Sequence, residues 1–132
     1  MTKNQIDELL RFLPMFDPPQ SDTAPTWVND QLADGTRCFP YPDYPPVVVD
    51  FFTQAGQDCW TDANYNVAED GDRLRDDAAV ASATLLQIKS MLTVCVRGER
   101  FCDGHWADVV KTGRVGAILR RLNELREEAT DE

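Results

Sequence analysis

Residues 82–126 carry three helical patterns of apolar side chains separated by glycines, and this stretch constrains the fold more than any other. The last pattern is the clearest, because its apolar residues recur every three or four positions. Its members are Val115, Ile118, Leu119, Leu122 and Leu125. Helices joined by short glycine-containing links are typical of a bundle, so the sequence predicts a compact, all-α fold.

The two preceding patterns predict a helix that is capped by Ser82 and ends at Gly98, and another from about Glu99 to Lys111 before Gly113. The first has an apolar stripe at Leu85, Ile88, Leu92, Cys95 and Val96. The second has inward positions at Phe101, Cys102, His105 or Trp106, and Val109. Cys102 is then expected to be a small buried residue, with His105 at the edge of the core.

Two further helices are predicted in the first half, which makes about five in all. Thr2 and Gln5 fit a capping box before a helix of about three turns that Pro14 kinks or ends. Its stripe is Ile6, Leu9, Leu10 and Leu13. A second helix is predicted to enter through Pro45-Pro46 and end at Gly56. Its stripe is Val48, Phe51, Phe52 and Ala55.

The remaining segments lack helical periodicity. Residues 17–46 are predicted to form an ordered irregular segment. We expect this segment to cover the core rather than to line a binding surface. A short hairpin is expected there, with Trp27-Val28 and Thr36 to Phe39 flanking Asp34-Gly35. Residues 62–77 are predicted to form an acidic loop, or else a frayed helix that ends near Ala68, and residues 127–132 an acidic frayed tail. All 132 residues are expected to form a single domain.

Several features indicate a soluble cytoplasmic protein. No stretch approaches the roughly 18 apolar residues of a membrane span, and residues 1–10 lack the layout of a signal peptide. In that compartment the cysteines are expected to be reduced thiols. They are Cys38, Cys59, Cys95 and Cys102.

The net charge of −10 is unevenly spread. Residues 1–77 carry fifteen acids and five bases, whereas residues 78–126 carry four acids and eight bases. The acidic balance argues against direct nucleic-acid binding and permits an acidic face for a basic partner. Two other interpretations stay open: a solvated surface, or neutralisation of residues 62–77 by the bases of residues 97–126. The candidate partner-binding residues are Asp62, Glu69, Asp70, Asp72, Asp76 and Asp77.

Catalytic patterns are weak in this chain. Cys102 and His105 are three residues apart, so on a helix they could share a metal or form a thiol site, although a zinc site needs further ligands. The stretch from Lys111 to Arg114 permits a helix-turn-helix, with Arg120 and Arg121 facing DNA. Phosphate-binding loops and hydrolase motifs are missing, and the chain has one His. We therefore expect no enzymatic activity and no cofactor.

The stretch VRGERFCDGHWA, Val96 to Ala107, follows the pattern VR-x-ERFC-[DE]-GH-x-A. Together with LLRFLPMF and CFPYPDYPPVVVDFF, it resembles a family of uncharacterised bacterial proteins, catalogued as a domain of unknown function. The resemblance implies a compact, mostly helical domain and brings no known activity, substrate or cofactor. It implies that these motif residues are important: Arg97, Arg100, Phe101, Cys102, Gly104, His105 and Gly113.

The charge pattern and the lack of a catalytic set favour a non-enzymatic interaction protein. We expect an acidic face of its N-terminal half to dock on a basic partner that handles nucleic acid, such as a defence nuclease. The protein would then act as a nucleic-acid mimic of the anti-CRISPR kind, in a bacterium or phage. The alternatives are the metal or thiol site at Cys102 and His105, and DNA binding through the last helix.

Overall fold

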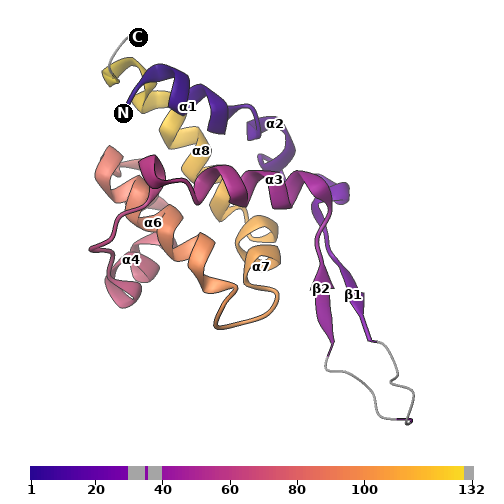
Figure 1. Cartoon of the computed structure of the whole chain (residues 1–132). Coiled ribbons are helices and arrows are strands. Elements are labelled where there is room, and N and C mark those ends of the chain that lie inside the picture. The colour runs from indigo at the N-terminus through magenta and orange to yellow at the C-terminus, as the bar shows by residue number, and fades with distance from the viewer. Residues whose placement is uncertain (30–34, 36–39, 130–132) are drawn as a thin grey trace.

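The computed structural model describes residues 1–29, 35 and 40–129, and helix α8 (Arg114–Leu125) lies at the centre of its packing. All five apolar residues of the predicted stripe in α8 are buried, which confirms this helix. It packs against helices from both ends of the chain (Figure 1). They are α1 (Lys3–Leu10), α2 (Leu13–Phe16), α5 (Asp77–Ala81), α6 (Leu85–Gly98) and α7 (His105–Lys111).

The capping box at Thr2 and Gln5 is confirmed: Thr2 accepts from the Gln5 N–H at 3.2 Å, and the Gln5 side chain accepts from the Thr2 N–H at 2.9 Å. The predicted three-turn helix is shorter, because α1 ends at Leu10 and Pro14 lies in the first turn of α2. Proline is tolerated there since its missing N–H would have no partner within the helix.

Helix α3 (Pro46–Ala55) begins and ends as predicted, and its four stripe residues are buried. Phe51 lies at an aromatic contact with the N-terminal helices, its ring centroid 5.4 Å from that of Phe12 and 5.0 Å from that of Phe16. Gly116 of α8 also meets this region, since a Cβ there would lie 2.5 Å from the carbonyl oxygen of Phe16. The missing side chain lets α8 approach the end of α2.

The hairpin exists with a different second strand. Strand β1 (Thr26–Val28) pairs antiparallel with β2 (Tyr41–Asp43), and Trp27 lies opposite Pro42. The predicted partner Thr36 to Phe39 lies outside the described residues, as does Asp34 of the turn. The two strands extend away from the helices (Figure 1). Trp27 is 51% exposed, so this part of segment 17–46 does not simply cover the core.

The prediction of a loop for residues 62–77 was wrong. Helix α4 (Val67–Leu74) and the start of α5 occupy much of this stretch. Short polar side chains cap the N-termini of these two helices. Asn66 accepts a hydrogen bond from the Glu69 N–H at 2.9 Å, and Asp76 accepts from the first N–H groups of α5. Capping overrides the polar, glycine-containing composition that indicated a loop.

The N-cap of helix α6 is Thr84, two residues after the predicted Ser82. Thr84 and Gln87 form a capping box, with N–H to side-chain oxygen distances of 3.2 and 2.9 Å. Ser82 instead ends α5, where its hydroxyl donates to the Ala78 carbonyl at 2.9 Å. Ile88, Leu92 and Cys95 are buried as predicted.

The described chain is thus mostly helical with one small two-stranded antiparallel sheet, as the sequence predicted. Three short 3₁₀ helices complete the described elements: Ser21–Thr23, Asp58–Trp60 and Arg126–Glu128. The last lies in the stretch expected to be a frayed tail, of which residues 130–132 fall outside the description. No helix among the described residues is long and apolar enough to cross a bilayer.

Candidate functional site

The motif segment 96–107 is not one continuous helix. Helix α6 ends at Gly98, a turn follows, and α7 begins only at His105. Gly104 has φ 89°, a left-handed conformation that residues with a side chain rarely adopt, and this interrupts the helix. The prediction of a helix from Glu99 was therefore wrong. Phe101 and Cys102 are exposed rather than turned inward.

The Glu99 carboxylate fixes the start of α7. It accepts hydrogen bonds from the backbone N–H groups of Gly104 at 2.9 Å and Trp106 at 2.8 Å. N–H groups at a helix start have no partner inside the helix, and negative charge there is favoured by the helix dipole. This acid therefore caps α7 and holds the preceding turn against it.

Tyr44 joins this cap to the segment before α3. Its hydroxyl donates to Glu99 at 2.8 Å and accepts from the Ala107 N–H at 3.3 Å. Its ring lies 5.3 Å from that of Trp106, which in turn stacks on Phe52 at 4.5 Å between centroids. Burial, followed by the hydrogen bond to Glu99, raises the pKa of Tyr44 well above its ordinary value. The hydroxyl thus stays protonated and can donate at physiological pH.

A mostly apolar pocket of about 420 Å³, here called the motif pocket, lies between α4 and the end of α6. Val67 and Gly71 of α4 and its C-cap residue Arg75 are spaced four residues apart and line one wall. The other wall comes mainly from the motif: Arg97, Gly98, Phe101, Cys102 and His105. Val67 is 64% exposed and Phe101 is 82% exposed, so apolar surface continues from the pocket to its rim.

Two side chains that line the motif pocket have polar groups without a hydrogen-bond partner among the described residues. The Arg97 guanidinium carbon lies 5.0 Å from the centre of the Tyr65 ring, and no carboxylate of the described chain pairs with it. The imidazole of His105 lies over Gly98, where an added Cβ would be 2.2 Å from Cδ2. Its Nε2 atom is buried without a hydrogen-bond partner among the described residues.

Cys102 and His105 do line the same pocket, as the hypothesis of a thiol or metal site requires. Over the part of the chain that the structure describes, however, no three His, Cys, Asp or Glu residues are grouped as metal ligands. Cys95, one heptad earlier, is fully buried, and burial raises the pKa of its thiol to about 12. The metal or thiol site at Cys102 and His105 therefore stays an untested alternative.

Three of the candidate acidic residues have structural roles. Asp62 accepts from the Ser90 hydroxyl at 2.6 Å, and this bond is the main cause that lowers its pKa. Asp70 is buried and accepts from the Asn66 N–H at 2.8 Å and from Arg73 at 2.6 Å. Asp76 caps α5.

The other three, Glu69, Asp72 and Asp77, are exposed. Glu69 pairs with Arg73 at 3.4 Å and Asp72 with Arg75 at 2.5 Å, whereas Asp77 has no ion pair with any described residue. The stretch 62–77 therefore presents charge on α4 and at the start of α5.

The predicted junction at Gly113 joins α7 to α8 with φ 81°. The two arginines proposed to face DNA already have partners within the chain. Arg120 is paired with Asp17, and Arg121 donates to the Ala83 carbonyl at 2.9 Å and to Glu124 at 3.1 Å. Phosphate binding through α8 would have to break these contacts.

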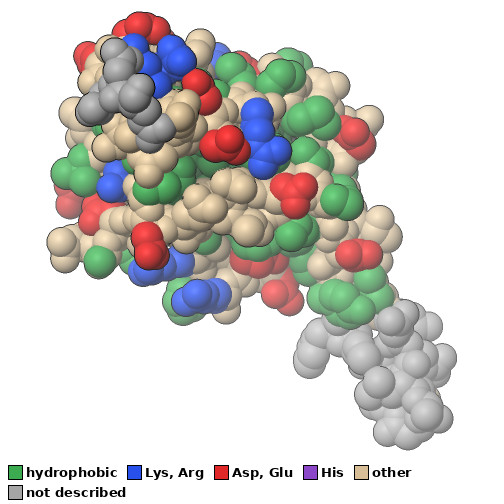
Figure 2. Space-filling view, turned by 45° about the horizontal axis from the view of Figure 1, so that its top comes forward, with side chains coloured by type: hydrophobic (Ala, Val, Ile, Leu, Met, Phe, Trp, Pro, Cys, Tyr) green, Lys and Arg blue, Asp and Glu red, His purple; other side chains and the backbone are tan. Residues whose placement is uncertain are grey.

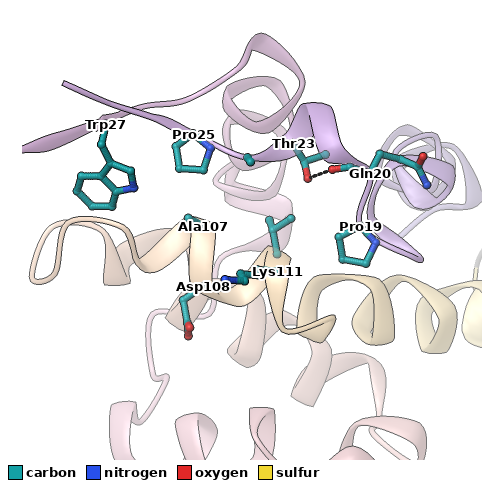
Figure 3. A pocket seen from close by; sticks show the side chains of 10 residues that line it. Pro19, Gln20, Thr23, Pro25, Trp27, Ala107, Asp108 and Lys111 are labelled. Atoms are coloured by element: carbon teal, nitrogen blue, oxygen red, sulfur yellow. Dashed lines mark hydrogen bonds between the residues drawn. The ribbon is translucent and has the colours of Figure 1, made fainter.

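A second, open groove of about 660 Å³ lies between α7 and the segment before β1 (Figure 3). Pro19, Pro25 and Trp27 form one side, and Asp108 and Lys111 come from α7 on the other. The Trp27 ring also closes over the motif turn, since a Cβ on Gly104 would lie 3.0 Å from it.

Sequence reasoning missed Glu99, Tyr44 and Trp106 as the residues that organise the motif. One signal was present: Glu99 directly follows α6, where the helix dipole disfavours an acid. An acid at that position indicates a partner elsewhere, here the start of α7. Tyr44 could not be found in this way, because it lies 55 residues away in sequence.

Arg97, Phe101, Cys102 and His105 are thus brought together in the motif pocket, whereas Arg100 is exposed and not among its lining residues. No curated protein and no solved structure matches this chain. A family model described as a family of unknown function, DUF6508, matches residues 1–128. The chain therefore belongs to the DUF6508 family.

Proposed function

We propose that this protein is a non-enzymatic interaction protein whose acidic stretch 62–77 docks on the basic surface of a nucleic-acid-handling partner. The supporting observation is the pattern of ion pairs. Residues 62–77 contain six acids and two bases, a net charge of −4. The carboxylates of this stretch pair only with its own Arg73 and Arg75 among the described residues.

Those bases of residues 97–126 that form ion pairs in the described chain do so away from the stretch 62–77. Arg120 pairs with Asp17, Arg121 with Glu124 and Arg126 with Asp7. Arg114 pairs with Asp108. The face in Figure 2 accordingly shows acidic, basic and hydrophobic side chains interspersed. One open interpretation was that the bases of residues 97–126 neutralise the stretch 62–77. No ion pair among the described residues joins these two stretches. The negative charge of α4 and the start of α5 is left to attract a partner.

A basic partner is favoured because complementary potentials speed encounter and select against other surfaces. Proteins that handle nucleic acid have positively charged grooves for phosphates, and a helix with several carboxylates can occupy such a groove. Glu69, Asp72 and Asp77 carry this role in the proposal, because they are exposed and cap no helix.

The test compares two variants with the same change in charge. The first is Glu69→Gln/Asp72→Asn/Asp77→Asn, and the matched control is Asp22→Asn/Asp43→Asn/Asp50→Asn, three exposed acids outside the stretch. Partners are purified with the wild-type protein from its host at low salt and identified by mass spectrometry. Each affinity is then measured with purified components at several salt concentrations, with nucleic acid as competitor.

We expect to find a basic partner whose affinity for the protein falls steeply as the salt concentration rises. Nucleic acid should displace this partner, and the first variant should bind it much more weakly than the control variant does. Affinity that is independent of salt, or lowered equally by both variants, would contradict docking through residues 62–77.

A further inference from the structure

The motif pocket combines an apolar interior with a cation that has no acidic partner in the described chain. Its volume of about 420 Å³ lies within the usual range for small-ligand sites, roughly 300–1,000 Å³. Val67, Val94 and Phe101 supply apolar surface, and Arg97 supplies the charge. We propose that the motif pocket binds a small organic carboxylate with an aromatic or aliphatic body.

Arg97 is placed to recognise the carboxylate group. Its guanidinium lies over the Tyr65 ring, which holds it in place without neutralising it. A planar guanidinium can donate two parallel hydrogen bonds to a carboxylate, and such charged bonds are about twice as strong as neutral ones. Arg75 on the opposite wall is paired with Asp72, so Arg97 is the lining base that still lacks an anion among the described residues.

The apolar walls favour a ligand with a hydrophobic body over a bare inorganic anion. Phe101 is 82% exposed, and covering it would remove unfavourable apolar surface from water. His105 lines the same wall, where its ring fits because Gly98 has no side chain.

This site differs from the docking proposed for residues 62–77 in its charge preference, because it attracts an anion through Arg97 rather than a basic partner through exposed carboxylates. The two proposals share α4, since Val67 and Gly71 line one wall of the pocket and Arg75 on that wall pairs with Asp72. Arg97 and Phe101 lie outside residues 62–77, so replacing them tests the pocket without changing the docking carboxylates.

The chain offers two internal reporters. His105 is the single His, so its imidazole signals in an NMR spectrum can be assigned without ambiguity. Cys102 is exposed at the pocket, and a bound ligand would slow its alkylation, whereas Cys59 lies outside the lining residues and serves as reference. The probes are 3-phenylpropionate and octanoate, each compared with its uncharged amide, together with a short peptide containing Glu and Phe.

Matched variants separate charge from apolar contact. Arg97→Gln and Arg100→Gln remove the same charge, but only Arg97 lines the pocket. Phe101→Ala and Leu86→Ala each truncate an exposed apolar residue, and only Phe101 lines it. Urea unfolding of each variant verifies that it is folded.

We expect saturable shifts of the His105 signals and protection of Cys102 with the carboxylates, and at least about tenfold weaker binding of the amides. Arg97→Gln and Phe101→Ala should weaken carboxylate binding, whereas Arg100→Gln and Leu86→Ala should not. Equal binding of acids and amides, or no saturable shift up to the solubility limit, would overturn the proposal. Binding of the peptide alone would overturn it in favour of a protein segment.

Discussion

The Glu99 carboxylate accepts a hydrogen bond of 2.8 Å from the Tyr44 hydroxyl and thereby joins the end of α6 to the segment that leads into α3. The same carboxylate caps α7 through the N–H groups of Gly104 and Trp106. One acid therefore joins the end of α6 both to the start of α7, which follows within a few residues, and to Tyr44, which lies 55 residues away in the chain. The motif turn, and with it the wall of the motif pocket, depends on this arrangement.

Replacement of Glu99 should destabilise the protein. Glu99→Ala leaves two N–H groups and one hydroxyl without their acceptor, and we expect a loss of about 2–3 kcal/mol in the free energy of unfolding. Urea denaturation measures this loss, with Glu124→Gln as a control at an exposed acid. If Glu99→Ala lowered the free energy of unfolding no more than the control does, water would be replacing the Glu99 carboxylate without loss of stability.

Gly98→Ala should also destabilise the protein, because its Cβ would lie 2.2 Å from the His105 ring. We expect a loss of about 1–3 kcal/mol, typical of overpacking. The double variant Gly98→Ala/His105→Ala removes the obstructing ring and should be less destabilised than the sum of the single variants. Strict additivity in urea denaturation would contradict the contact.

The ion pair between Asp7 and Arg126 should make stability depend on pH in acid. The hydrogen bond from Arg126 is the first cause that lowers the Asp7 pKa below its ordinary 3.8. A lowered folded-state pKa contributes stability above the unfolded value, and this is lost as pH falls through the folded pKa. The wild type should therefore lose more stability than Asp7→Asn between about pH 6 and pH 2. The neighbouring Glu8→Gln, paired with Arg11 at 3.7 Å, is the control. Parallel pH profiles of the urea midpoints for wild type and Asp7→Asn would contradict the prediction.

The described thiols should react at very different rates. Cys102 is exposed, whereas Cys95 is fully buried and burial raises the pKa of its thiol to about 12. Because the thiolate is the reactive form, alkylation at about pH 8 should modify Cys102 and spare Cys95 until the protein unfolds. Mass spectrometry of peptides after timed alkylation, with and without urea, measures both rates. Early modification of Cys95 would show that this part of α6 opens readily.

The sequence by itself determined the elements whose apolar residues have a strong period. The stripes in α3 and α8 and the capping box of Thr2 were read correctly, because helix periodicity and local capping involve residues only a few positions apart. The existence of one short hairpin and the mostly helical fold followed from the same local rules.

The tertiary structure decided what depends on distant partners. Whether Phe101 and Cys102 face inward was settled by the cap that Glu99 places on α7 and by the left-handed Gly104. The second strand was set by pairing across the hairpin, with Trp27 opposite Pro42. The motif pocket likewise forms only when α4 packs beside α6. The strand pairing, the bond from Tyr44 to Glu99 and the packing of α4 on α6 join residues remote in sequence, so their energies are not visible in a local pattern.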